Sequence, residues 1–333
     1  MPEAVRPSRM PIAAMEAKSA ERLPDGDGWQ FEPKWDGFRC IADKRKGAVS
    51  LFAKSGKPLG RYFPDMVALL ESLPADELVL DGELTIRIEG HLSFDALQMR
   101  LHPAASRVRK LAEAQPATLV LFDLLVAPHG LEMAGRPLTE RRARLEQFFA
   151  EHQRVGLELS PATVDRRLAD EWLAGAGGDF DGVIAKRLGA PYAPGERDML
   201  KIKRIRTADC VVGGFRYGTD SRLIGSLLLG LYDDAGRLNH VGFTSNIPAE
   251  ENAALTKGLE RLRNGPGFTG HAPGGHSRWS TERTGEYEAL EHAIVIEVAF
   301  DHVSSGRFRH GTRFLRWRPD KQPDQCRMEQ LRG

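Results

Sequence analysis

The chain has 333 residues, of which 41% are hydrophobic and 28% charged, and its formal net charge is only +1. This composition excludes an intrinsically disordered chain, and the length favours about two domains, each able to bury a core. No apolar stretch approaches the roughly 20 residues that span a bilayer, and the first residues lack the apolar core of a signal peptide. We therefore expect a cytoplasmic protein without a membrane partner.

The first two hundred residues alternate between strand and helix patterns. Short apolar runs predict strands at 38–42, 49–53, 78–84, 118–125 and 183–186. Helical periodicity predicts helices at 64–73, 93–101, 139–150 with Thr139 as N-cap, and 165–174 between Asp165 and Gly175. The absence of a regular βαβ rhythm and of Gly-x-Gly-x-x-Gly after the first strand argues against a Rossmann domain. The fold class is α+β.

After residue 206 the pattern changes to short strands, at 210–217, 226–232, 238–243, 293–300 and 314–317. One helix, at 248–263, interrupts them, and the segment 264–275 is rich in Gly and Pro and predicts a loop. Five strands with an inserted helix fit an oligonucleotide-binding (OB) barrel, although other small barrels fit as well. We predict two domains, 1–206 and 207–333.

The cysteines and the local charges narrow the possibilities further. Cys40, Cys210 and Cys326 lie far apart without a Cys-x-x-Cys pair, which argues against a disulfide framework and a zinc cluster and favours buried thiols. The low net charge gives no indication of nucleic-acid binding, but Lys and Arg outnumber acids in residues 186–206 and 302–333. Such stretches suit phosphates, although a solvated charged face explains a single run equally well.

A lysine near the N-terminus is the first candidate for chemistry. Within Phe-Glu-Pro-Lys-Trp-Asp-Gly-Phe-Arg (31–39), Pro33 cannot donate to a sheet ladder, so Lys34 is expected just after a strand or on an exposed edge. Gly37 permits a turn before the next strand. A lysine amine attacks phosphorus only when deprotonated, which desolvation or neighbouring cations favour. Taken alone, the pattern fits a surface lysine in a turn better.

Acids and lysines recur on the later strands. Asp81 and Glu83 share one face of a strand, where paired oxygens suit a hard cation or a ribose hydroxyl. Phe122 suits core packing or base stacking. In residues 181–186, Asp-Gly-Val-Ile-Ala-Lys places an acid at the start of a strand and a lysine at its end, and Lys201 and Lys203 share a face of the next strand, where two cations match a polyphosphate. Each element alone also fits a solvated edge strand.

The C-terminal residues 310–321 concentrate arginines beside aromatic residues. Guanidinium groups bind phosphate oxygens bidentately and also stack on base planes. A nucleic-acid-binding face and a charged tail explain this segment equally well when it is taken without the other elements.

The order of these elements is more informative than any one of them. Lys-x-Asp-Gly, Asp-Gly-Glu, Phe-Asp, Asp-Gly-x-x-x-Lys, Lys-x-Lys and Arg-x-Asp-Lys follow one another between residues 34 and 321. This order resembles the signature of covalent nucleotidyltransferases, which are the DNA ligases, RNA ligases and mRNA capping enzymes. The segments 31–39 and 314–321 resemble bacterial ATP-dependent DNA ligases of the ligase C type, akin to the ligase module of bacterial end-joining proteins. The resemblance implies a nucleotidyltransferase (adenylation) domain of antiparallel sheets with helices, followed by an OB-fold barrel.

The resemblance also implies roles for particular residues. Lys34 would be the catalytic nucleophile that takes AMP from ATP, and Glu83 with Asp181 would hold Mg²⁺ or Mn²⁺. The implied ATP-binding residues are Glu32 beside adenine, Phe122 stacked on it, Glu83 at the ribose, Lys201 and Lys203 at the α-phosphate, and Arg318, Asp320 and Lys321 at the β and γ phosphates. Arg39 would contact the ribose or the 3' side of the nick, and Lys54 would contact ATP or the 5'-phosphate. Arg39, Lys54 and Arg61 are the implied DNA contacts.

Two residues depart from the family pattern. The family usually has Ser-Arg-x-Gly where this chain has Ala-Lys-Ser-Gly at 53–56, so Lys54 keeps the charge but lacks the bidentate fork of arginine. Asp181 stands where many relatives have Glu, and its carboxylate arm is one methylene shorter. The contact that Lys54 makes with phosphate and the distance from the metal to the carboxylate of residue 181 are therefore expected to differ from those of the family.

The implied function is that of an ATP-dependent DNA ligase (EC 6.5.1.1 type), which seals 3'-OH/5'-phosphate nicks through lysyl-AMP, DNA adenylate and phosphodiester formation. The implied setting is DNA repair or recombination in the bacterial cytoplasm at the nucleoid. The implied partners are nicked double-stranded DNA and DNA-repair or end-joining proteins, and the implied protein is a monomer with a hinge at 204–208. An RNA ligase or RNA guanylyltransferase, and an inactive nucleic-acid-binding module, are the alternatives.

Overall fold

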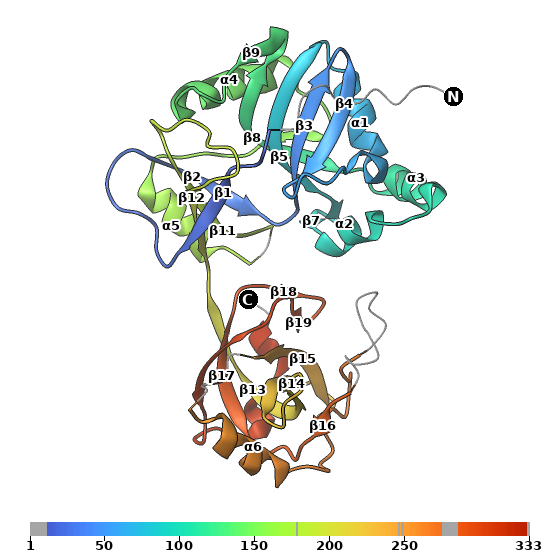
Figure 1. The fold of residues 1–333 in the computed structure, drawn as a ribbon, viewed down its shortest axis with the longest axis vertical. Helices are drawn as coiled ribbons and strands as arrows, with labels where there is room; N and C mark the ends of the chain where they lie inside the picture. The colour runs from blue at the N-terminus through green and yellow to red at the C-terminus, as the bar shows by residue number, and fades with distance from the viewer. Residues whose placement is uncertain (1–11, 178, 246, 248–249, 275–285, 332–333) are drawn as a thin grey trace. The chain divides into compact units, whose positions relative to one another are not determined.

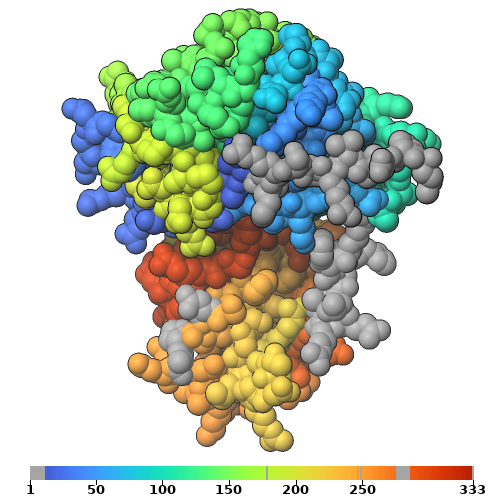
Figure 2. Space-filling model, turned by 45° about the horizontal axis from the view of Figure 1, so that its top comes forward, coloured from blue at the N-terminus to red at the C-terminus, as the bar shows by residue number. Residues whose placement is uncertain are grey.

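A computed structural model describes residues 12–331 of the chain except 178, 246, 248–249 and 275–285. The chain divides into two compact units, with the division between Lys203 and Arg204 (Figure 1). The first unit is coloured from blue to yellow-green in Figures 1 and 2, and the second from yellow to red. In the part of the chain described, no helix has both the length and the apolar character needed to cross a membrane.

The first unit is built on a four-stranded and a six-stranded sheet. The strand orders are β1-β12-β11-β2 and β10-β8-β5-β3-β4, with β9 paired to β8. The pairs β1–β12 and β8–β10 are parallel, and the other pairs are antiparallel. The strands are β1 (Glu16–Ala20), β2 (Trp29–Trp35), β3 (Phe38–Arg45), β4 (Ala48–Ala53), β5 (Glu77–Thr85), β8 (Thr118–Ala127), β9 (Leu131–Glu132), β10 (Leu157–Leu159), β11 (Phe180–Arg187), β12 (Arg197–Lys203) and the hairpin β6 (Arg87–Ile88) and β7 (His91–Leu92).

Helices cover these sheets, and their ends follow the sequence signals. The helices are α1 (Pro64–Glu71), α2 (Phe94–Arg100), α3 (Ala105–Ala114), α4 (Leu138–Glu151), α5 (Arg166–Ala174) and the 3₁₀ turns η1 (Gly60–Tyr62) and η2 (Pro128–Gly130). Asp165 caps α5 as predicted, because its carboxylate accepts a hydrogen bond from the Arg167 N–H at 2.8 Å. Ser93, predicted at the start of α2, caps that helix in the same way.

The predicted cap of α4 is wrong. The helix begins at Leu138, directly after Pro137, and no side chain caps it. The backbone N–H groups of Leu138 and Thr139 instead donate to the carbonyls of Ala190 and Leu188. Carbonyls of a loop distant in sequence therefore satisfy backbone amides at the start of this helix. Helix α3 and strand β1 had not been predicted.

The main core of the first unit lies between the six-stranded sheet and the helices on it. Met66 and Leu70 of α1, Leu145 and Phe148 of α4, and Leu80 of β5 are at most 2% exposed. Each such side chain contributes roughly 1.5–3 kcal/mol when it leaves water. This packing fixes the strands that carry the candidate site.

Gly37 joins β2 to β3, where a turn was predicted. A Cβ at this position would collide with the Leu84 carbonyl oxygen of β5. The glycine is needed because the backbone of β5 approaches closely, which holds the end of β2 against the six-stranded sheet.

The second unit contains one main sheet of order β15-β14-β13-β17-β20, with β16 paired to β13. An isolated bridge between Thr244 and Thr312 brings the end of β15 beside the start of β20, but the sheet is not a closed barrel. This agrees with a partly open OB-fold. Its elements are β13 (Arg206–Tyr217), β14 (Ile224–Tyr232), β15 (Leu238–Thr244), α6 (Asn252–Glu260), β16 (Glu288–Ala289), β17 (Val295–Phe300), β18 (Val303–Ser304), β19 (Arg307–Phe308), β20 (Arg313–Trp317), η3 (Pro323–Gln325) and η4 (Met328–Leu331).

The five predicted strands of this unit are confirmed within a few residues as β13, β14, β15, β17 and β20. The predicted helix at 248–263 is shorter and covers Asn252–Glu260, and its first two predicted residues lie outside the described part. Over 264–274, the described portion of the predicted loop, there is neither helix nor regular strand. Cys40, Cys210 and Cys326 are free and buried, as predicted.

Candidate active site

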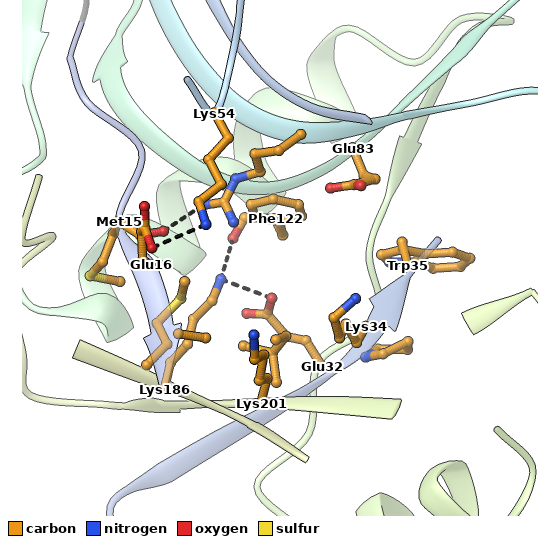
Figure 3. Close-up of a pocket in the computed structure, with 15 residues that line it drawn as sticks. Met15, Glu16, Glu32, Lys34, Trp35, Lys54, Glu83, Phe122, Lys186 and Lys201 are labelled. Atoms are coloured by element: carbon orange, nitrogen blue, oxygen red, sulfur yellow. Dashed lines mark hydrogen bonds and ion pairs between the residues drawn. The ribbon is translucent and has the colours of Figure 1, made fainter. Parts of the chain in front are cut away.

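A cavity of about 240 Å³ lies in the first unit, with residues of both sheets in its wall. Seven predicted site residues line it: Glu32, Lys34, Arg39, Lys54, Glu83, Phe122 and Lys201. Figure 3 shows Glu83 and Phe122 on one side of the cavity and Glu32, Lys34 and Lys201 on the other. Residues from five separate strands therefore meet around one small volume.

Lys34 lies within β2, the edge strand of the four-stranded sheet. Of the two predicted positions, the edge is confirmed. The Lys34 Nζ atom is 2.8 Å from Asp181 Oδ1 of β11, and the Lys203 Nζ atom is 3.0 Å from Asp181 Oδ2. Burial disfavours ionisation of Asp181, but the charges of Lys34 and Lys203 hold its pKa below the ordinary value. One carboxylate thus serves two lysines, of which Lys34 lines the cavity, whereas Asp181 and Lys203 do not.

Lys201 contributes a third amine to the same region. Its ammonium forms no ion pair with any residue in the described ranges. Burial and the charges of Lys203 and Lys34 lower its pKa from the ordinary value. The repulsion indicates an excess of positive charge, which an anion such as a triphosphate would relieve.

Glu32 is held on the cavity wall by two partners. Its Oε2 atom lies 2.8 Å from Lys186 Nζ, and its Oε1 atom accepts a hydrogen bond from Gln30 Nε2 at 2.7 Å. Lys186 also donates to the Phe122 carbonyl oxygen, and its Nζ lies 4.8 Å from the centroid of the Phe122 ring. Glu32 and Lys186 are both buried, and the two partners give the carboxylate a fixed orientation.

Arg39 is fixed by a network that reaches across the unit. Its guanidinium donates two hydrogen bonds to Asp81 and lies 4.5 Å from the centroid of the Phe122 ring. The Tyr192 hydroxyl donates to Asp81 at 2.7 Å and accepts from the Met15 N–H at 2.8 Å. Burial alone would lower the pKa of Arg39, but Asp81 raises it. Asp81 is therefore occupied by protein groups, which separates it from Glu83 despite their shared strand.

Glu83 lines the cavity together with Glu16 and Glu32. Burial raises its pKa to about 7, although the charges of Lys34 and Arg39 oppose the shift. The group therefore changes charge close to neutral pH. Such a carboxylate is stabilised in its ionised form when a hydroxyl donor or a cation binds beside it.

Lys54 and Arg61 lie further out. The Lys54 Nζ atom is 3.0 Å from Glu16 Oε2 of β1, and its side chain is 57% exposed. Arg61 is exposed in η1, where it donates to the Pro103 carbonyl oxygen and stacks on Tyr62 at 5.0 Å, and it does not line the cavity. A second hollow of about 630 Å³ extends from Arg39, Lys54 and Glu83 to Leu59 and Leu101.

Arg318 and Lys321 belong to the second unit. Their side chains lie 2.7 Å and 2.6 Å from the two carboxylate oxygens of Asp209 in β13. Arg318 also donates to Asp320. These three predicted residues therefore form a cluster of their own within that unit.

Several residues of the cavity were not predicted as site residues. Lys186 had been recognised as the end of a strand motif but not as a partner of Glu32. Its signal is the alternation along β11, which places Ile184 and Lys186 on the same side, and both line the cavity. The remaining lining residues are Met15, Glu16, Ala17, Pro33, Trp35 and Met199. Pro33 and Trp35 flank Lys34 within the motif at 31–39, whereas no short motif marks Met15, Glu16, Ala17 and Met199.

The fold and the cavity define a class of protein: a lysine-bearing nucleotidyltransferase domain followed by an OB-fold domain. The model of the ATP dependent DNA ligase domain matches residues 11–203, and that of the ATP dependent DNA ligase C terminal region matches residues 220–321. The chain belongs to the ATP-dependent DNA ligase family and is an ATP-dependent DNA ligase.

Curated relatives agree with this assignment over their whole lengths. DNA ligase C2 of Mycolicibacterium smegmatis is 42% identical over 96% of this chain and 94% of its own length. DNA ligase C of Mycobacterium tuberculosis is 39% identical over 98% of this chain and 95% of its own length. The RNA ligase and guanylyltransferase alternatives are not favoured.

A solved structure supports the fold. A structure from a structure–function study of Lig E DNA ligases covers 92% of this chain and 100% of its own, with a TM-score of 0.59 and 16% identity. At this identity the likeness concerns the fold alone.

Proposed function

We propose that this ligase seals 3'-OH/5'-phosphate nicks in double-stranded DNA with an AMP carried on Lys34. The observation that supports it most is the position of the Lys34 amine, beside Asp181 in a cavity with surplus positive charge. The amine would attack the α-phosphorus of ATP, so that a P–N bond forms and pyrophosphate leaves with the electrons of the broken P–O bond. Cations that neutralise the phosphates supply most of such catalysis.

Lys34 is paired as an ammonium with Asp181, and an ammonium cannot attack. The first requirement is therefore that Asp181 release Lys34 and that the amine lose its proton. Lys201 and Lys203 would then lie next to the α-phosphate and disfavour a proton on a third amine beside them. The DNA 5'-phosphate next takes AMP from Lys34, and the 3'-OH finally displaces AMP.

Glu32 supports adenine as the base. An ionised carboxylate only accepts hydrogen bonds, so its fixed orientation beside Lys186 suits the exocyclic amine of adenine. Guanine presents a carbonyl oxygen at the corresponding position, which the carboxylate repels. Phe122 would stack on the base, and Glu83 and Arg39 would bind the ribose. This argues for ATP over GTP.

The donor set suits Mg²⁺ or Mn²⁺. Glu83 and Asp181 offer carboxylate oxygens, and across the described residues no group of three or more metal-ligating side chains occurs. Mg²⁺ is commonly held by one or two carboxylates together with substrate phosphates, so this sparse set fits a metal that arrives with ATP. When bound, the metal would neutralise phosphate charge. The side chain of Asp181, one methylene shorter than that of Glu, would set the distance between the metal and the Asp181 carboxylate.

The second unit would act through Arg318, Asp320 and Lys321, which would orient pyrophosphate as the leaving group. The segment 204–208 would serve as the hinge that brings these residues to ATP and withdraws them before DNA binds. We assign residues 1–206 to the adenylation domain and residues 207–333 to the OB-fold domain. Lys54, Arg39 and Arg61 would contact DNA.

The cellular setting is also part of the proposal. We place the enzyme in the cytoplasm at the nucleoid, as a monomer that acts in DNA repair or recombination, with DNA-repair or end-joining proteins as partners. The matches to DNA ligases C and C2 support DNA as the substrate in this setting.

A sealing assay tests the proposal. A nicked duplex with a labelled 5'-phosphate is incubated with ATP, with NAD or with GTP, and a parallel reaction with labelled nucleotide is resolved on a denaturing gel. We expect sealing and a covalent adduct with ATP alone. An adduct formed only with GTP, or sealing restricted to RNA strands, would refute the proposal in favour of its RNA-directed relatives.

A further inference from the structure

Asp209 is a buried acid that the proposed reaction does not use. Asp209 lies near the start of β13, and its two carboxylate oxygens contact different cations: Arg318 Nη1 at 2.7 Å and Lys321 Nζ at 2.6 Å. The side chain of Asp209 is 12% exposed, and those of Arg318 and Lys321 are 17% and 23% exposed. The three groups thus form a partly buried cluster in which one anion bridges two cations.

The backbone of Asp209 is fixed from the other end of the same unit. Gln330 accepts a hydrogen bond from the Asp209 N–H at 2.9 Å and donates to the Asp209 carbonyl oxygen at 3.0 Å. Asp209 also pairs with Glu297 in the β13–β17 ladder. The carboxylate is therefore held on a rigid strand, whereas its two partners carry long, rotatable side chains.

Three carboxylates surround the single positive charge of Arg318. Asp320 binds it at 2.9 Å, and Glu297 lies 3.8 Å away, in addition to Asp209. The pKa of Arg318 is raised, chiefly by the hydrogen bond from its guanidinium to Asp320 and further by Asp209. These carboxylates are competitors for any phosphate that must bind to Arg318 and Lys321.

We infer that Asp209 is a holding site for Arg318 and Lys321, which means that its carboxylate binds both cations while no triphosphate is bound. The two oxygens of this carboxylate occupy the place that pyrophosphate oxygens take during adenylylation. The inference rests on the proposed roles of Arg318 and Lys321. Two oxygens on one carbon offer the same two-point contact as two oxygens of a phosphate. Asp209 keeps the pair side by side when no triphosphate is present, and it must release both cations when one binds. It acts through Arg318 and Lys321 and is a positioning residue.

The test measures binding of inorganic pyrophosphate to the full chain by calorimetry, without divalent metal and without catalysis. Asp209→Asn removes the competing charge at constant size, and we expect its Kd to fall about fivefold. Asp209→Glu retains the charge and should stay within about twofold of the unmodified chain. Asp209→Ser provides the same loss of charge in a smaller side chain, should Asp209→Asn not fold.

A mutant cycle assigns the gain to the two cations. In the Arg318→Ala/Lys321→Ala chain, Asp209→Asn should leave the Kd unchanged. Three results would each overturn the holding site. Asp209→Asn could bind pyrophosphate no more tightly than the unmodified chain, or Asp209→Glu could gain as much affinity as Asp209→Asn. The third is a gain in affinity from Asp209→Asn that persists in the Arg318→Ala/Lys321→Ala chain. The separate failure of the unmodified chain to form an ATP adduct would refute the proposed function instead, because the calorimetry needs no reaction.

Discussion

The cations of the two units have different partners, although both groups are proposed to bind the same triphosphate. In the first unit, Lys34 and Lys203 share the single carboxylate of Asp181, and burial together with the charges of Lys203 and Lys34 lowers the pKa of Lys201. In the second, Arg318 and Lys321 are neutralised by Asp209 and further acids. The first unit is therefore prepared to receive an anion, whereas the second must exchange one anion for another.

This difference suggests an order of events. A site with excess positive charge binds ATP directly, and long-range attraction increases its association rate. A site that carries its own carboxylates binds phosphate only when several contacts form together, so it is selective for the complete triphosphate.

Replacement of Lys34 should abolish the first step. Lys34→Ala removes the amine that would form the P–N bond, and we expect the rate of self-adenylylation to fall at least about 10⁴-fold. The measurement is the labelled protein–AMP adduct on a denaturing gel. Lys201→Ala is the informative control, because it removes a neighbouring amine and should slow the step without eliminating it. A persistent adduct in Lys34→Ala would move the nucleophile to another residue.

Loss of the second unit's cations should affect one step and spare another. We expect Arg318→Ala/Lys321→Ala to reduce adenylylation about 10²-fold, since two charges on the leaving group are lost. Sealing of a nick that already carries AMP should keep its rate, because no pyrophosphate leaves in that step. Arg327→Ala, an exposed arginine of the same unit, is the matched control. Equal losses in both steps would contradict the proposed withdrawal of the OB unit.

The two units also differ in how much of their chemistry the sequence could predict. In the first, Lys34, Glu83, Phe122 and Lys201 could be assigned to strands from short motifs, and the structure brings them to one cavity. Alternation along each strand was sufficient, because it determines which side chains share a face. Their chemical roles stay predictions.

Partners distant in sequence could not be predicted. The pairing of Lys186 with Glu32 depends on the register of β11 against β2, and that of Asp209 with Arg318 and Lys321 joins residues more than a hundred positions apart. The predicted Thr139 cap failed for the same reason, since a distant loop accepts its backbone hydrogen bond. Local patterns predicted elements, whereas tertiary contacts determined the partners of their polar groups.

The dependence of stability on pH tests whether burial in the cavity of the first unit raises the pKa of Glu83. Its pKa is about 7 in the folded chain against an ordinary value of 4.5. Both states bind the proton below pH 4.5, and the folded state must then ionise a buried carboxyl as pH rises through 7, so stability is lost over that interval. The shift corresponds to about 3 kcal/mol at most. Glu83→Gln should therefore be more stable than the unmodified chain at pH 8, by up to that amount, and equal to it near pH 4.5.

Urea unfolding at both pH values measures this difference. Glu113→Gln, on the exposed side of α3, is the matched control and should show no difference that depends on pH. If Glu83→Gln differed from the unmodified chain by the same free energy at every pH, the pKa of Glu83 would be the same in the folded and unfolded chain. Glu83 would then be ionised at neutral pH, and burial at the cavity would not raise its pKa.

The smallest effect is expected at Arg61, the outlying cation of the first unit. The hollow that begins at Lys54 and Glu83 ends at Leu59 and Leu101, and Arg61 follows Leu59 by two residues. A strand of DNA that leaves the cavity along this hollow would place one phosphate beside Arg61. Arg61→Ala should weaken binding of nicked DNA about twofold to threefold and reduce the slope of log K against log salt by about one.

Fluorescence anisotropy over a range of KCl concentrations measures both quantities. Arg167→Ala removes an equal charge from a different element of the first unit, helix α5, where the side chain is 85% exposed, and should change neither. Adenylylation without DNA should be unaffected by Arg61→Ala, because Arg61 does not line the cavity. An unchanged salt slope would mean that the DNA takes another path, and the excess positive charge of the first unit would then serve the nucleotide alone.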